Sequence, residues 1–157
     1  MQQSAERLHL IYPVLPPSAN HIYIRGTVLK REAREYKAAF KQWAVQNHMH
    51  DISNFAAGSD LVYGLHLAFF FDSLVNESYN DKSKPPSRRA KTRYKRLDLD
   101  NRVKFLQDCI RDVIDVDDSR IFAASQEKHQ DPTNPRVEIV VQSVDPTLFG
   151  IEEDIPM

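Results

Sequence analysis

The sequence has little of what several common classes of protein require. Its 157 residues contain one cysteine, Cys109, which excludes a disulfide within the chain and a zinc site built from several cysteines. Only four glycines are present, and no P-loop or GxGxxG motif occurs. No apolar run approaches the ~20 residues of a transmembrane helix, and the first residues lack the features of a signal peptide. We therefore expect a cytoplasmic protein without a membrane partner.

Acidic residues are missing from one internal segment, residues 82–96, although the formal net charge of the chain is only −1. The basic residues of this segment are Lys82, Lys84, Arg88, Arg89, Lys91, Arg93, Lys95 and Arg96. Lys and Arg neutralise phosphates and release counterions, so the segment has the composition of a nucleic-acid contact. A solvated loop has the same composition, and the residues alone leave both interpretations open.

Hydrophobic periodicity predicts the order strand, helix, strand, long loop, helix, strand, strand. We expect strands at 8–15, 61–71, 121–129 and 136–144, helices at 30–47 and 101–114, a connector at 48–60 and the long loop at 72–97. The second strand is the most hydrophobic and is expected at the centre of the sheet, with the last two forming a closing pair. The predicted class is α/β or α+β: one domain, residues 1–144, with two main helices on a small mixed sheet and a flexible acidic tail at 145–157.

Carboxylates stand at both ends of the second predicted helix. Asp98 and Asp100 precede it and, in an extended segment, point to the same side, which suits a hard cation such as Mg²⁺. Asp100 is equally a natural helix N-cap. Asp117 and Asp118 follow the helix, where they are equally typical of a surface turn. A bend after the helix would bring this second pair back towards the first.

Lys104 lies one turn beyond Asp100, on the polar side of the same helix. A lysine close to a bound phosphate stabilises the charge that develops during phosphodiester hydrolysis. A solvated position, or an i, i+4 pair with Asp108, explains Lys104 as well. Cys109 lies on the apolar side and is expected in the core rather than as a nucleophile.

Several of these motifs together resemble the RusA family of Holliday junction resolvases. The matching stretches are LPPSANHIY at 15–23, KRLDLDNRVKFLQD at 95–108, DDSRI at 117–121 and NPRVEIVV at 134–141. The resemblance extends from about residue 10 to residue 141. It implies a RusA-like fold and a small Mg²⁺-dependent endonuclease, with Mn²⁺ as a substitute, that acts as a homodimer on four-way DNA junctions.

The resemblance also assigns roles to residues. Asp98, Asp100 and Asp118 correspond to metal ligands with catalytic roles, Asp117 to a fourth acidic member, and Lys104 to a catalytic lysine. DNA contacts are expected from Arg88, Arg89, Lys91, Arg93, Lys95, Arg96, Asn20 and Lys128. The loop at 72–97 is longer than the family pattern leads us to expect, the connection from Asp108 to Asp117 is one residue shorter, and the tail is extended.

The hypothesis is therefore an endodeoxyribonuclease that resolves Holliday junctions in recombination and repair by paired phosphodiester cleavage. We expect it in the cytoplasm, associated with the nucleoid, in a protein of prokaryotic or phage origin. Two alternatives stay open: a flap or single-strand nuclease with the same metal chemistry, and a junction-binding protein that has lost cleavage. The hypothesis requires Asp118 to lie within a few ångströms of Asp98, with Lys104 facing the same point.

Overall fold

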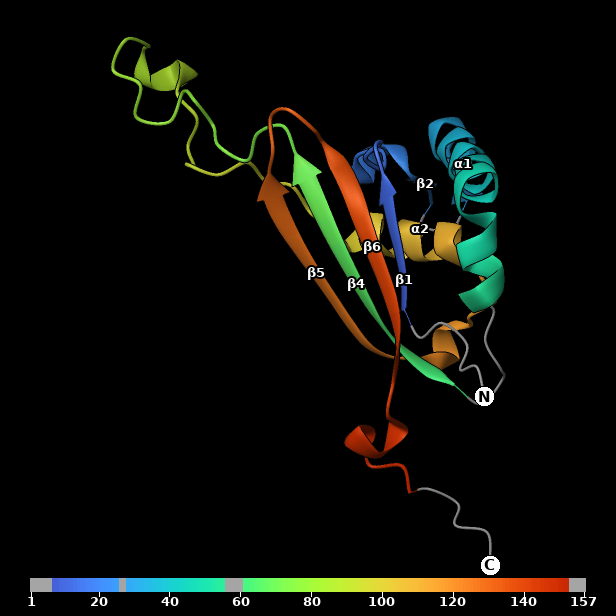
Figure 1. The fold of residues 1–157 in the computed structure, drawn as a ribbon. Coiled ribbons are helices and arrows are strands. Elements are labelled where there is room, and N and C mark those ends of the chain that lie inside the picture. The colour runs from blue at the N-terminus through green and yellow to red at the C-terminus, as the bar shows by residue number, and fades with distance from the viewer. Residues whose placement is uncertain (1–6, 26–27, 56–60, 153–157) are drawn as a thin grey trace, which may run out of the picture.

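The computed structural model describes residues 7–25, 28–55 and 61–152 (Figure 1). A mixed four-stranded sheet forms one layer, and the helices α1 and α2 lie on one of its faces (Figure 1). The alternating burial of the strands turns one set of side chains towards the helices and leaves the other set on the opposite face. This arrangement confirms the predicted class, a small mixed α/β domain.

The sheet has the order β1-β6-β4-β5, in which β4 and β5 are parallel and the other neighbours are antiparallel. Its strands are β1 Arg7–Tyr12, β4 Val62–Phe71, β5 Ile121–Gln130 and β6 Arg136–Val144. The central place of β4 is as predicted. The expected closing pair is wrong, because β4 lies between β5 and β6. The most apolar strand gains two neighbours in this way, and β5 takes the edge with mostly exposed residues.

The first helix, α1, runs over Arg31–Phe55 and is longer than predicted. A kink at His48, with φ −135° and ψ 19°, marks the place where the connector was expected. The chain nevertheless returns to helix because Phe55 is buried and its ring lies 5.3 Å from that of Tyr63. The remaining connector residues, 56–60, lie outside the described residues.

The second helix, α2, spans Asp100–Arg111 and completes the core. Its buried residues are Arg102, Phe105, Leu106, Cys109 and Ile110. Cys109 has no exposed surface, and burial raises the pKa of its thiol to about 12. The thiol is therefore protonated at neutral pH and inert, which confirms its predicted place in the core.

Short elements escaped the sequence prediction. They are η1 Ala19–His21, β2 Tyr23–Ile24, β3 Val28–Leu29, η2 Pro86–Arg88, η3 Asp118–Arg120 and η4 Pro146–Phe149. In η4 the Phe149 ring meets Phe122 edge-on at 5.6 Å, so the first part of the expected tail is folded; residues 153–157 lie outside the described residues. No helix in the described part of the chain is long and apolar enough to cross a membrane.

One buried cation joins three segments of the fold. Arg102 of α2 is only 7% exposed, and its Nε donates a hydrogen bond to the Pro17 carbonyl at 3.3 Å. Its Nη1 reaches the Asp98 carbonyl at 3.5 Å, and its guanidinium lies 5.3 Å from the centre of the Phe71 ring. Burial lowers the pKa of Arg102, and the nearby charge of Asp98 opposes this effect. The N-terminal loop, the end of β4 and the turn before α2 are thereby held together.

We expect Arg102→Met to lower the free energy of unfolding by about 1–3 kcal/mol, because the Pro17 carbonyl loses its donor in a dry environment. Urea denaturation measures this change. The matched control is Arg31→Met, which removes an exposed i, i+4 pair with Glu35 and is expected to cost less than about 0.5 kcal/mol. Equal losses for the two variants would contradict the structural role of Arg102.

Candidate active site

Two carboxylates, two residues apart in sequence, lie at the start of α2. Asp98 Oδ1 accepts a hydrogen bond from the Asp100 backbone N–H at 3.0 Å. Asp100 is the first residue of the helix and is exposed, so it is not the N-cap; Leu99 occupies that position, and the Asp98 side chain accepts the first free helical N–H, that of Asp100. Both carboxylates lie at the helix end where the macrodipole favours negative charge.

Two ammonium groups accompany these carboxylates. Lys128 of β5 donates from Nζ to the carbonyl of Leu97 at 3.2 Å, directly before Asp98 in the chain. Lys104 lies one turn along α2 from Asp100, on the same side of the helix. The N-terminal end of α2 thus combines two carboxylates with two ammonium groups.

The ammonium of Lys104 is held by an aromatic ring rather than by a carboxylate. Its Nζ lies 4.9 Å from the centre of the Tyr23 ring, whereas Asp108 pairs with Arg111 at 2.7 Å. The i, i+4 pair with Asp108 that the sequence allowed is therefore not formed. Burial, and then the charge of Asp108, raise the pKa of Tyr23 to about 12, so its hydroxyl is protonated at neutral pH.

Asn20 lies in η1, which contacts α2. Its backbone carbonyl accepts a hydrogen bond from Lys30, and the residue is exposed. The Arg102 contact with Pro17 keeps this N-terminal loop near the start of α2. Asn20 is thus placed on the same side of the domain as the carboxylate turn.

The second acidic pair lies at the other end of α2. Asp118 Oδ2 is 3.7 Å from Nη1 of Arg111, the last residue of the helix. Asp117 Oδ2 accepts a hydrogen bond from the Ser119 hydroxyl at 3.0 Å. Acidic groups are unfavourable at a helix C-terminus, and Arg111 supplies the compensating charge.

One chain therefore does not bring its four aspartates together. The helix from Asp100 to Arg111 rises about 16 Å at 1.5 Å per residue. Asp118 stays with Arg111 and does not fold back onto Asp98. Among the residues that the structure describes, no three His, Cys, Asp or Glu side chains are grouped so as to hold a metal ion.

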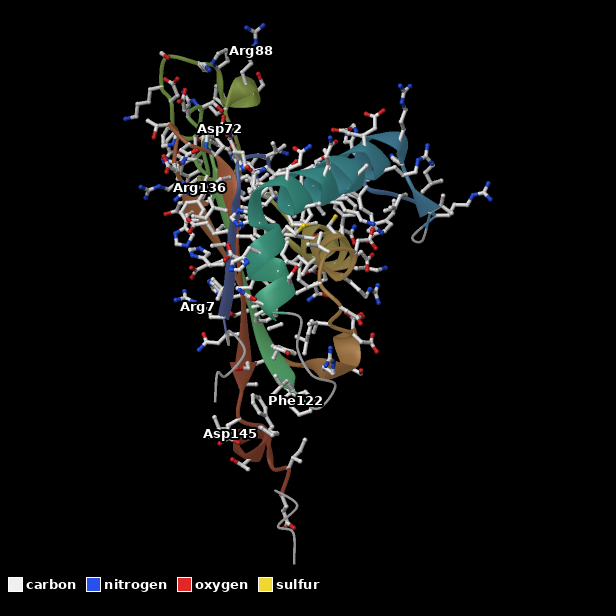
Figure 2. The ribbon with its side chains drawn as sticks, turned by 45° about the vertical axis from the view of Figure 1, so that its right-hand side comes forward. Arg7, Asp72, Arg88, Phe122, Arg136 and Asp145 are labelled. Atoms are coloured by element: carbon white, nitrogen blue, oxygen red, sulfur yellow. The ribbon has the colours of Figure 1, made fainter. Side chains whose placement is uncertain are left out.

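The segment 72–97, which we call the arm, projects from the sheet beyond the end of β4 (Figure 1). Its two sides are joined near the base, where Asn76 N–H bonds to Arg93 O at 2.8 Å and Lys95 N–H to Leu74 O at 2.9 Å. Figure 2 shows Asp72 at the base of the arm and Arg88 at its far end. The predicted long loop is thus an ordered, hairpin-like element.

The basic residues of the arm divide into two groups. Arg89 is half-buried, and its Nε donates to the carbonyls of Asp81 at 2.8 Å and Lys84 at 2.9 Å. It closes the end of the arm from inside. The others are exposed: Lys82, Lys84, Arg88, Lys91, Arg93, Lys95 and Arg96. These exposed basic residues are distributed along the arm, from Arg88 at its far end to Arg96, two residues before Asp98.

Arg102 is the positioning residue that sequence reasoning missed. Its guanidinium donates a hydrogen bond to the backbone carbonyl of Asp98 and so fixes the position of the carboxylate turn. The signal was present, because Arg102 stands three and four residues before Phe105 and Leu106, on the apolar stripe of α2. An arginine at such a position is rarely buried unless its donors are satisfied.

A family model described as Endodeoxyribonuclease RusA matches residues 13–142. The matched segment contains the carboxylate turn, Lys104, the whole arm, and Asp117 and Asp118 after α2. No curated protein matches the chain. RusA resolvases are in general dependent on a divalent metal ion. Because the match covers most of the chain, the protein belongs to the RusA family of endodeoxyribonucleases, hydrolases of DNA phosphodiester bonds that resolve Holliday junctions.

Proposed function

We propose that the protein is a Mg²⁺-dependent enzyme that makes paired cuts in four-way DNA junctions during recombination and repair. The observation that carries this proposal is the N-terminal end of α2, where Asp98 and Asp100 stand with Lys104 and Lys128 beside a basic arm. Hard carboxylate oxygens suit Mg²⁺, and Mn²⁺ would be accepted by the same ligands. When bound, the ion would activate water and stabilise the leaving oxygen.

The chain's own groups have distinct tasks in this proposal. Asp98 and Asp100 would be ligands, and the hydrogen bond from Asp100 N–H fixes the orientation of the Asp98 carboxylate. Lys104 would place positive charge near the scissile phosphate, where it counters the negative charge of the transition state. Its contact with Tyr23 leaves the ammonium uncommitted to any carboxylate of the described residues.

The distance between the two acidic groups supports a site shared by two chains. Three carboxylates are needed for the proposed ligand set, and α2 keeps Asp118 at the opposite end from Asp98 and Asp100. In a two-fold homodimer, Asp98 and Asp100 of one chain would meet Asp118 of the other, with Asp117 nearby. The same symmetry would create two equal sites, one for each strand that a junction resolvase cuts.

We expect Asp100→Asn to abolish cleavage of a four-way junction in Mg²⁺ while junction binding in Ca²⁺ is retained, because an amide is a poorer ligand of a hard cation. Gel assays with end-labelled DNA measure both. Asp51→Asn, which changes an exposed aspartate on α1, is the control and should cut normally. Retained cleavage by Asp100→Asn would remove Asp100 from the metal site. Parallel assays on flap, single-stranded and linear duplex DNA distinguish the alternative nuclease functions.

The shared site makes a strong prediction about mixed dimers. Asp100→Asn and Asp118→Asn should each be inactive alone. Refolding the two variants together should restore single nicks, because the mixed dimer contains one site with both changes and one site with neither. An intact site cannot arise in this mixture if each chain supplies all of its own ligands. Absence of nicking in a mixture shown to contain mixed dimers would contradict the shared site.

The exposed arm residues predict a salt-dependent affinity. Changing Arg88, Lys91 and Arg93 together to Gln should weaken binding to every form of DNA and reduce the slope of log K against log salt by about 2–3, at about 0.9 per phosphate contact. Fluorescence anisotropy at several salt concentrations measures the slope. The control removes three exposed charges from α1 instead, at Arg31, Arg34 and Lys41, and should leave the slope unchanged. Equal effects would mean that net charge, not the arm, governs binding.

A further inference from the structure

The most exposed large aromatic side chain in the described part of the protein is Tyr94, on the arm. It is 61% exposed, compared with 38% for Tyr79 on the same arm. The Arg93 guanidinium lies 5.5 Å from the centre of its ring, and Lys95 and Arg96 follow it in the sequence. A large ring in solvent among basic residues is not explained by packing, since it buries little surface.

The backbone of Tyr94 is held firmly although its side chain is largely exposed. Tyr94 forms a bridge with Val75, and the flanking bonds from Asn76 N–H and Lys95 N–H fix the chain on both sides. The Tyr94 carbonyl accepts hydrogen bonds from the Thr92 hydroxyl at 3.0 Å and the Asn76 amide at 3.3 Å. The backbone that carries the ring is therefore fixed, and removing the ring would leave these hydrogen bonds in place.

The base of the arm is also anchored to the sheet beside the carboxylate turn. Leu74 N–H donates to the side chain of Gln130 at 2.8 Å, and Lys128 reaches the Leu97 carbonyl at 3.2 Å. Tyr94 precedes Asp98 by four residues, which span at most about 14 Å. At 3.4 Å per nucleotide along one strand, the backbone of Tyr94 is therefore at most about four nucleotides from the carboxylate turn.

We propose that Tyr94 stacks on a DNA base that has a free face at a branch point, and that this contact selects branched DNA over continuous duplex. The inference rests on the proposed function and names a specificity-determining residue for it. The basic residues around Tyr94 bind phosphates in any DNA and cannot make this distinction. The Tyr94 ring can distinguish branched DNA from duplex by stacking. Each base inside a continuous duplex is covered by neighbouring bases on both faces, whereas a base at a branch or strand end has one face open.

The test measures binding without cleavage, in EDTA, for the wild type, Tyr94→Ala, Tyr94→Phe and Tyr79→Ala. The ligands are a four-way junction with 2-aminopurine at the branch, a linear duplex of the same sequence and a single strand. Base stacking on an aromatic residue predicts that Tyr94→Ala binds the junction about 5- to 140-fold more weakly. Binding to the linear duplex should weaken far less, because its only open base faces are those of the base pairs at its two ends. Tyr94→Phe and Tyr79→Ala should bind the junction like the wild type.

The fluorescence of 2-aminopurine gives a second, independent readout. The wild type and Tyr94→Phe should change the emission of the branch base in the same way, and Tyr94→Ala should not. A loss on the single strand equal to that on the junction supports stacking on any unpaired base. Undiminished junction binding by Tyr94→Ala, or an equal loss on linear duplex, overturns the proposal.

Failure of this inference is distinguishable from failure of the proposed function. If the wild type prefers and cuts junctions but Tyr94→Ala does so equally well, the stacking role of Tyr94 is wrong and the proposed function is unaffected. If the wild type shows no preference for branched DNA, both the proposed function and the role of Tyr94 are wrong. Circular dichroism of Tyr94→Ala should match the wild type, since the residue's backbone bonds do not involve its ring.

Discussion

The structure depends on one buried guanidinium. Arg102 occupies a position on the apolar stripe of α2 where a charge is costly unless its donors are satisfied. The Pro17 and Asp98 carbonyls and the Phe71 ring meet this need from three different segments. Each of these contacts also fixes a segment to which we assign a function: the N-terminal loop, the start of the arm and the carboxylate turn. A lysine could not replace it, because a single ammonium lacks the planar fork that spans these partners.

The rigidity of α2 then determines what one chain can do. The helix keeps its two ends about 16 Å apart, and the chain after it leaves Asp118 at the far end from Asp98 and Asp100. Arg111 holds Asp118 at the far end and offsets the unfavourable dipole there. A metal site made from both groups needs a second copy of the chain. Dimerisation would then be part of the chemistry, beyond its role in matching the symmetry of the junction.

The sequence predicted the elements better than their partners. The alternation of β6 and the apolar run of β4 are local properties, and both strands were found where expected. The order of strands depends on which residues compete for the centre of the sheet, which no local pattern contains. The helix after His48 was missed for a similar reason, since the burial of Phe55 against Tyr63 is a long-range contact. Within the candidate site, the sequence already placed carboxylates at both ends of the helix, but only the structure shows that the chain after the helix does not fold back and that Asp118 stays beside Arg111.

The arm shows most clearly why composition is a weak guide to order. Its Pro, Ser, Lys and Arg content is typical of a flexible segment, yet polar side chains replace a hydrophobic core inside it. Arg89 bonds to two carbonyls, Asn76 bridges the two sides near the base, and Ser78 accepts the Ala90 N–H at 2.9 Å. A segment ordered in this way loses less conformational entropy when it binds. In the proposed complex, its exposed charges and the Tyr94 ring would act as a preformed surface, and a preference for branched DNA would follow from shape as well as from charge.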